Sequence, residues 1–156
     1  MKTQNGHTDR YLLILLLMIM VGLPLGIRAY DHAVWAAKIP AGAKVFTLTG
    51  NTDRGWILGR VTALDTLLDQ EAAAPPDRPV IRVAKGDKVV FKIMSSDVVH
   101  GFSLKDMGIF LTDGIPPGKV RLVSFVADKV GTFTFSCNAI CGKNHEKMQG
   151  TLIVTG

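Results

Sequence analysis

Apolar residues follow two contrasting patterns along the chain. Between Tyr11 and Ile27 they form a stretch of 17 residues without a charged side chain. From Lys44 onward they occur in short runs of β-branched and aromatic residues, several of them alternating with polar side chains and separated by glycine and proline. The first pattern is typical of a membrane-crossing helix. The second predicts short strands packed as a β-sandwich or barrel.

The N-terminal stretch leaves two interpretations open. As a helix it would be about 26 Å long, slightly short of a bilayer core of roughly 30 Å, and continuing past Arg28 to Tyr30 would add length. It could be an uncleaved anchor, or a signal peptide cleaved after Ala29. The length of the apolar run favours the anchor. Both interpretations export the rest of the chain, so we predict a membrane-anchored protein with its folded domain on the periplasmic or extracytoplasmic side.

The chain is predicted to contain an anchor at residues 1–29, a linker at residues 30–43 and one β-domain at residues 44–156. Pro40 and Gly42 break any helix in the linker. Strands are expected in KVFTLTG, in PVIRVAKGDKVVFKIMS on both sides of a KGD turn, and in VHGFSL, VRLVSFVA, TFTFSC and TLIVTG.

One segment departs from the strand pattern. Between Val61 and Pro79 the leucines stand at helical spacing and are followed by alanine- and proline-rich sequence. We expect a short helix or an irregular excursion here, inserted at residues 61–79 between two strands.

The charge of the chain excludes one class of partner. The formal net charge is +5, and removing Lys2, Asp9, Arg10 and Arg28 leaves 15 basic and 12 acidic residues, or +3, in the exported part. No basic run is interleaved with aromatic residues. The pattern indicates a mixed, solvated surface, and nucleic acid is not an expected partner.

Chemistry-bearing side chains gather in SCNAICGKNHEKMQG, residues 136–150. Cys137, Cys141, His145 and Met148 lie there on one predicted loop between two strands. Thiolate, imidazole and thioether ligands select copper, zinc or iron–sulfur, and methionine points to copper. A blue-copper site needs a second histidine, and His100, at the start of a predicted strand, is the candidate.

Each of these residues also has an ordinary explanation. The two cysteines could form a disulfide, which an exported protein permits. His100 could be a hydrogen-bonded histidine at a strand end, His145 a solvated loop residue, and Met148 part of the core. All these explanations must hold together if no metal is bound, whereas one metal centre accounts for the whole set. We therefore favour a metal centre, and His7 and His32 have no part in it.

The motifs resemble a known family. DVVHGF, then a Pro/Gly loop, then GTFTFSCNAICGKNHEKMQGTLIV is similar to the copper domain of cytochrome c oxidase subunit II. This is the CuA cupredoxin family, which also includes a domain of nitrous oxide reductase. The likeness is close over residues 79–156, and a single helix followed by IPAG resembles the compact, one-helix subunits. It implies a mainly β, cupredoxin-like Greek-key β-sandwich preceded by a single N-terminal transmembrane helix.

The resemblance also implies a dinuclear CuA centre with two copper ions. Cys137 and Cys141 would bridge the coppers through their thiolates, while His100 and His145 would each bind one copper. Met148 would be a weak axial ligand on one side. A mononuclear cupredoxin has one cysteine in this loop, so the second cysteine is the feature that distinguishes the two kinds of site.

Three positions depart from the family pattern. Ala139 would supply its backbone carbonyl as the weak ligand on the other side. Many members have a glutamate there that helps hold a second, non-copper metal, so the resemblance implies no such site in this chain. Many members also have a tryptophan-rich motif that accepts electrons from the donor. Here KVFTLTGNTDRGW offers only Trp56, which we hypothesise as the residue at which electrons arrive. The insertion at residues 61–79 has no family counterpart that we can assign.

The implied function is that of a non-catalytic electron-transfer subunit. It would take electrons from cytochrome c or another small redox carrier and pass them to a haem-containing oxidase subunit I, where the oxygen chemistry takes place. Alternatives are a free-standing CuA carrier, a partner of a nitrous or nitric oxide reductase, a copper chaperone, and a metal-free sandwich with a disulfide. Such chaperones usually alternate strands and helices, a pattern that this chain lacks.

Overall fold

The structure is a computed structural model that describes residues 6–36, 38–61, 65, 78–142 and 144–156. The chain divides into two compact units, Met1–Ala41 and Gly42–Gly156. The predicted insertion at residues 61–79 lies almost wholly outside the described residues, so its expected helix stays a prediction.

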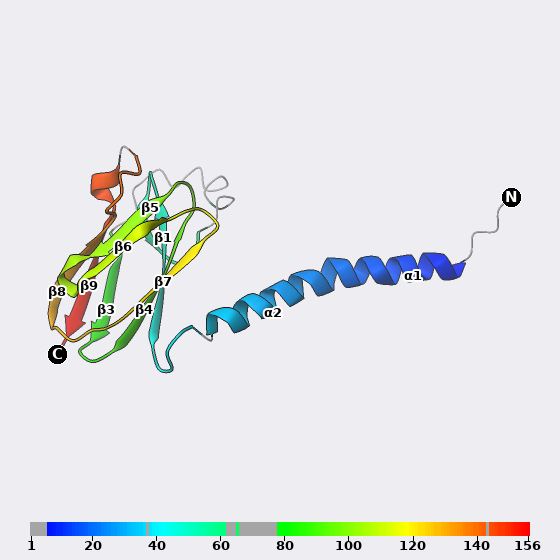
Figure 1. Cartoon of the computed structure of the whole chain (residues 1–156), viewed down its shortest axis with the longest axis horizontal. Coiled ribbons are helices and arrows are strands. Elements are labelled where there is room, and N and C mark those ends of the chain that lie inside the picture. Colours follow the sequence, from blue (N-terminus) through cyan, green and yellow to red (C-terminus); the bar gives the residue numbers. More distant parts are fainter. Residues whose placement is uncertain (1–5, 37, 62–64, 66–77, 143) are drawn as a thin grey trace. The chain divides into compact units, whose positions relative to one another are not determined.

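The N-terminal unit is helical. Helix α1 (Gly6–Leu17) continues through a π-helical turn, Met18–Gly22, into α2 (Leu23–Ala36), drawn in blue in Figure 1. Within it, the 24 residues Thr8–Asp31 are long and apolar enough to cross a membrane. At 1.5 Å per residue this stretch is about 36 Å long, more than a bilayer core requires.

The helix extends further than the sequence pattern indicated. It continues to Ala36, into the stretch 30–43 that was predicted as a linker, because DHAVWA contains no glycine or proline and ends in alanine-rich sequence. Pro40 and Gly42 lie beyond the helix, and the first strand begins at Lys44, where the β-domain was expected to start.

The described part of the second unit contains nine strands in two sheets. They are β1 (Lys44–Asn51), β2 (Gly55–Leu58), β3 (Val80–Ala84), β4 (Lys88–Ser95), β5 (His100–Leu104), β6 (Ile109–Ile115), β7 (Val120–Val126), β8 (Gly131–Ser136) and β9 (Gln149–Thr155). One sheet has the order β2-β1-β4-β7 and the other the order β3-β9-β8-β5-β6. Figure 1 shows the sheets as two layers of a sandwich.

Every strand expected from the sequence is present, and two further strands were not expected. These are β2, which has only four residues, and β6, which contains Asp113 and Gly114, residues typical of turns. The predicted turn at Lys85–Asp87 joins β3 and β4, which lie in different sheets. The Asp87 carboxylate holds this turn by accepting hydrogen bonds from Ala84 N at 2.7 Å and from Lys44 Nζ at 2.6 Å.

Aromatic side chains fill the space between the sheets. Phe91 is central, with its ring centroid 5.9 Å from that of Phe102 and 6.0 Å from that of Phe135. Trp56 packs edge-on against Phe102 at 5.6 Å. Aromatic pairs of this kind each contribute about 0.5–1.5 kcal/mol beyond the burial of their surface. The core therefore fixes how the two sheets stack.

The strand order brings distant parts of the sequence to one end of the sandwich. Strand β8 pairs antiparallel with both β5 and β9. The end of β8, the start of β5 and the start of β9 therefore lie together. His100 begins β5, Cys137 follows β8, and Met148 precedes β9. The topology alone thus gathers the predicted metal ligands.

Candidate metal centre

The loop between β8 and β9 is closed by backbone hydrogen bonds at its base. Cys137 N donates to Met148 O at 3.0 Å, joining the first and last predicted ligands of the loop. A short 3₁₀ helix, His145–Lys147, precedes β9, and Met148 N donates to His145 O at 3.1 Å. These contacts hold both ends of the loop against the sheet.

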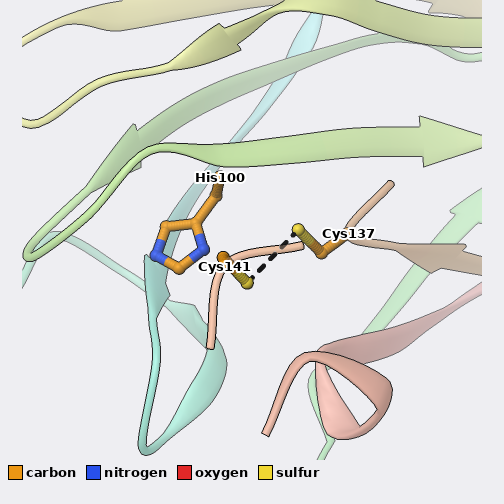
Figure 2. A group of neighbouring side chains, drawn as sticks. All are labelled: His100, Cys137 and Cys141. Carbon is orange, nitrogen blue, oxygen red and sulfur yellow. Dashed lines mark hydrogen bonds between the residues drawn. The ribbon is translucent and has the colours of Figure 1, made fainter. Parts of the chain in front are cut away.

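Cys137, Cys141 and His100 form the centre of the cluster. One ligand atom from each lies within 4.8 Å of the others. The two Sγ atoms are 3.7 Å apart and both cysteines are free thiols. Figure 2 shows the thiols side by side, with one ring nitrogen of His100 facing them. The predicted alternative of a disulfide is therefore not the state that the structure describes.

The other predicted ligands surround this pair. His145 Nδ1 is 3.6 Å from Cys141 Sγ, and Met148 Sδ is 3.2 Å from the same sulfur, which donates to it. On the other side, the Cys137 thiol donates to Ala139 O at 3.1 Å. His145 lies outside the compact group of three and contacts it through Cys141. All six predicted residues thus form one connected cluster.

His100 is held from two sides. Its side chain is 0% exposed, and its Nε2 is 2.7 Å from Asp97 Oδ1. Within the described part of the chain, Nδ1 is buried without a hydrogen-bond partner. A Cβ on Gly50 would lie 2.8 Å from His100 Cδ2, so only glycine leaves room for the ring. A buried nitrogen without a partner is costly unless something else binds it.

A bulge in β5 brings a backbone donor to the site. The pairing of β5 with β6 changes register between His100 and Phe102. Gly101, at the bulge, donates its N–H to Cys137 Sγ at 3.2 Å. A Cβ on Gly101 would lie 1.9 Å from Asn138 Oδ1 and 2.8 Å from Ala139 N. The ligand loop can approach β5 this closely only because residue 101 is glycine.

The two cysteines differ in acidity. Burial would raise the pKa of Cys137, but its interaction with His100 and hydrogen bonds within the loop and from Gly101 lower that pKa to about 6. Burial raises the pKa of Cys141 to about 12, and its interaction with Cys137 adds to the rise. Burial alone would lower the pKa of His100, but its interactions with Cys137 and Asp97 raise that pKa above its ordinary value. In the metal-free protein a negative charge is therefore favoured on Cys137 over Cys141.

The donor set matches a soft metal ion. Two thiols, two imidazoles and a thioether lie close together, and Nδ1 of His100 is buried without a hydrogen-bond partner in the described part of the chain. Thiolate and thioether ligands together suit copper better than the hard cations, which take oxygen. The residues present therefore fit a copper site.

A family model matches this half of the molecule. Residues 68–155 match the model of cytochrome c oxidase subunit II, periplasmic domain, which covers more than half of the chain. The chain belongs to the cytochrome c oxidase subunit II family. The resemblance inferred from the two motifs is thus confirmed.

Individual proteins with similar sequences include two cytochrome c oxidase subunits 2. Cytochrome c oxidase subunit 2 of Thermus thermophilus is 38% identical over 74 residues, which are 47% of this chain and 53% of that protein. Cytochrome c oxidase subunit 2 of Myxine glutinosa is also 38% identical, over 68 residues that cover 44% of this chain and 29% of that protein. The chain thus spans about half the length of the Thermus relative that it matches.

Solved structures share the fold. The periplasmic domain of subunit II of cytochrome oxidase (CoxB) of Bradyrhizobium japonicum aligns with a TM-score of 0.53 at 20% identity, covering 75% of this chain and 87% of that one. The copper nitrite reductase of Nitrosomonas europaea aligns with a TM-score of 0.52 at 22% identity, covering 72% and 41%. The predicted cupredoxin-like β-sandwich with one N-terminal apolar helix is confirmed.

Trp56 lies behind the site rather than on the surface. It is 1% exposed, and its ring centroid is 6.2 Å from that of His100. Its role in receiving electrons stays a prediction, but a donor could not touch the indole directly.

Sequence reasoning missed the residues that support the ligands. Asp97, Thr52 and Gly101 all contact ligands or their partners, yet the sequence pattern assigned none of them a role, although Asp97 and Gly101 lie within the quoted motif DVVHGF. For Asp97 a signal existed, because it stands three residues before His100 and a metal-binding histidine usually has such a partner. Nothing in the sequence placed Thr52 beside Asp97.

Proposed function

We propose that this chain is the electron-transfer subunit of a haem–copper terminal oxidase and carries a dinuclear copper centre of the CuA type. The observation that carries the proposal is the pair of free thiols 3.7 Å apart, within a cluster that also holds two imidazoles and a thioether. Membership in the subunit II family supports the same reading. A single-copper site would need only one of the two cysteines.

Each side chain would have a defined part in holding copper. Cys137 and Cys141 would bridge the two ions through their thiolates, and His100 and His145 would each bind one ion. Met148 Sδ and the backbone carbonyl of Ala139 would be the weak ligands, a place consistent with their contacts to Cys141 and Cys137 respectively. When bound, the copper pair supplies a centre that accepts and releases one electron.

The protein contributes rigidity and exclusion of water. His100 and Met148 are each 0% exposed and Cys137 is 6% exposed, while the loop is hydrogen-bonded at its base. Ligands held by strand ends and core packing change position little when the charge of a metal changes. Small rearrangement is the property that fast electron transfer requires.

The location and partners follow from the family and the N-terminal helix. We propose that Thr8–Asp31 anchors the chain in the membrane, with the β-sandwich on the periplasmic or extracytoplasmic side. A haem-containing subunit I would accept the electrons, and cytochrome c or another small redox carrier would supply them. A solved relative at 21% identity is described as a heme-copper terminal oxidase dimer, which agrees with this partner.

Copper stoichiometry and electron paramagnetic resonance test the centre. The full chain, purified in detergent, reduced and then loaded with copper, is expected to bind two coppers per chain. Its spectrum should show hyperfine structure from one electron shared by two nuclei. One copper with a single-nucleus spectrum would contradict the proposal and indicate a blue-copper or chaperone-like site. No copper uptake together with two readily titrated thiols would indicate a metal-free sandwich.

The role of Trp56 has its own test. If electrons reach the centre through this buried indole, Trp56→Phe should slow reduction by the donor while leaving copper content unchanged. Phenylalanine keeps most of the packing against Phe102 but removes the larger, more easily oxidised ring. Stopped-flow reduction measures the rate, and a rate equal to that of the unmodified protein would remove Trp56 from the electron path.

A further inference from the structure

One carboxylate outside the ligand set is connected to the site. Asp97 lies in the loop between β4 and β5, three residues before His100, and its Oδ1 is 2.7 Å from His100 Nε2. The same oxygen accepts from Val98 N at 2.7 Å. A carboxylate accepts but does not donate when ionised. The proton in the contact between Asp97 and His100 therefore belongs to the histidine.

The other oxygen of Asp97 is held by a different part of the chain. Asp97 Oδ2 accepts from Thr52 N at 2.6 Å and also from the Thr52 hydroxyl. Burial alone would raise the pKa of Asp97, but these bonds and those from His100 and Val98 lower it below its ordinary value. All four hydrogen bonds at the carboxylate are accepted, so the anionic form suits this position.

Thr52 links this carboxylate to the ligand loop. It lies in the turn between β1 and β2, and its Cγ2 would be only 2.5 Å from a Cβ on Gly142, the residue after Cys141. The end of β1, directly before this turn, is tied to the β4–β5 loop, because Asn51 Nδ2 donates to Ser96 Oγ at 3.1 Å and Ser96 N donates to Gly50 O at 3.0 Å. One turn thus contacts both halves of the site.

We propose that Asp97, held by Thr52, is a positioning residue that keeps the proton of His100 on Nε2 and so presents an unprotonated Nδ1 to the copper centre. The inference rests on the proposed copper function. It explains why Nδ1 is buried without a protein partner while Nε2 has one. Hydrogen bonds to the second ring nitrogen are the usual means by which proteins fix the tautomer of a metal-binding histidine.

The charge of Asp97 has a second consequence. An anion that hydrogen-bonds to a copper ligand stabilises the more positive, oxidised state of the centre more than the reduced state. Asp97 should therefore lower the reduction potential. Replacing it by a neutral residue should raise the potential, in a direction that simple loss of packing would not predict.

The most informative variant is Asp97→Asn, which keeps the shape of the side chain. Thr52, Val98 and His100 all donate to the carboxylate of Asp97. The amide group of asparagine would face donors with donors, on the Thr52 side or on the side of Val98 and His100. We expect copper affinity about 10–100-fold weaker and a higher reduction potential. Thr52→Val, which keeps the methyl contact with Gly142 but loses the hydroxyl, should cause a smaller shift in the same direction.

Two controls separate positioning from general effects. Asp128→Asn makes the same charge change at the other end of β8 from Cys137 and should leave affinity and potential unchanged. Thr52→Ser keeps the hydroxyl that Thr52→Val lacks, so its reduction potential should be close to that of the unmodified protein. An Asp97→Asn variant with unchanged affinity and unchanged potential would overturn the proposal.

A copper-free measurement distinguishes failure of this proposal from failure of the proposed function. In the reduced, metal-free full chain with ¹⁵N-labelled histidine, nuclear magnetic resonance should show a slowly exchanging proton on Nε2 of His100. Asp97→Ala should abolish the slow exchange. An unprotonated Nε2 in the unmodified protein would refute the role of Asp97. If the Nε2 proton is present but the chain binds no copper, the proposed function fails while the positioning of His100 stands.

Discussion

At the scale of single residues, the two cysteines are not equivalent. Cys137 is buried, accepts a backbone hydrogen bond from Gly101 and contacts Ala139 O, whereas Cys141 is only partly buried and contacts His145 and Met148. Between them Ile140 is 94% exposed, so the loop that holds the sulfurs reaches the surface. Cys137 therefore belongs to the frame of the sheet, and Cys141 to the loop that closes over it.

Cys141→Ser tests whether both sulfurs are needed for two metals. A serine hydroxyl is a poor ligand for copper compared with a thiolate, so we expect one copper per chain and a spectrum from one nucleus. Metal analysis and electron paramagnetic resonance measure both. Thr132→Ser, a comparable change on the exposed face of β8, serves as the control and should keep two coppers. Two coppers in the Cys141→Ser protein would contradict the bridging role.

At the scale of elements, the ends of β5 and β8 determine the site. The bulge in β5 turns the N–H of Gly101 toward a sulfur rather than toward a neighbouring strand. Ser103 on β5 pairs with Ser136 on β8, directly before Cys137. A displacement of β8 relative to β5 would therefore separate Cys137 from His100.

Gly101→Ala should separate the ligand loop from β5. The new Cβ would overlap Asn138 Oδ1 and crowd Ala139 N, and overpacking of this kind typically costs about 1–3 kcal/mol. We expect a lower free energy of unfolding in the copper-free protein and weaker copper binding, measured by chemical denaturation and by competition with a chelator. The double variant Gly101→Ala/Asn138→Ala removes the worst overlap and should recover part of the loss. Unchanged copper affinity in Gly101→Ala would show that the close approach is dispensable.

The turn between β3 and β4 predicts a pH effect on stability. The ion pair with Lys44 and the hydrogen bond from Ala84 lower the pKa of Asp87 below its ordinary value of 3.8. A lowered carboxyl pKa in the folded state stabilises the fold above the unfolded pKa, and this contribution is lost as pH falls through the folded pKa. The stability advantage of the unmodified protein over Asp87→Asn should be present at neutral pH and be lost as the pH falls below the ordinary value of 3.8 and through the lower folded pKa.

Urea denaturation of the copper-free protein measures this difference at each pH. Leaving copper out removes the separate effect of protons competing with metal for the ligands. The effect should be small, because Asp87 and Lys44 are accessible to solvent and exposed ion pairs contribute little. A difference that grows as pH falls would reverse the predicted sign.

At the scale of the whole molecule, the two units have opposite preferences for solvent. The large apolar side chains described within Thr8–Asp31 are exposed. Those of the sandwich are mostly buried in its own core. A free helix with so many exposed apolar side chains is unfavourable in water, and a bilayer removes that cost.

Membrane fractionation tests this division. The full chain should stay in the membrane pellet after alkaline carbonate extraction, which strips peripheral proteins. A variant starting at Gly42, the first residue of the second compact unit, should appear in the soluble fraction and retain its β-rich circular dichroism spectrum. If expression of the full-length sequence instead gives a soluble product of lower mass, the N-terminal segment is a cleaved signal peptide.

The sequence by itself determined seven of the nine described strands, the apolar helix and the composition of the ligand set. These features are local: alternation, glycine and proline breaks, and the spacing of Cys137, Cys141, His145 and Met148 can be read within short windows. Recognition of the subunit II family followed from the same windows. The end of the helix was placed too early because DHAVWA, which continues it to Ala36, is less apolar than the stretch before it, and β6 was missed because Asp113 and Gly114 are typical of turns.

Only the tertiary structure decided which residues support the ligands. Thr52, Asp97 and Gly142 are far apart in sequence, and their contacts depend on a turn between β1 and β2 that packs on the β4–β5 loop. The burial of Trp56 and the bulge at Gly101 likewise depend on how the two sheets stack. Ligand types are fixed by side-chain chemistry, which the sequence states directly. Their orientation is fixed by contacts between distant segments, which arise only when the chain has folded.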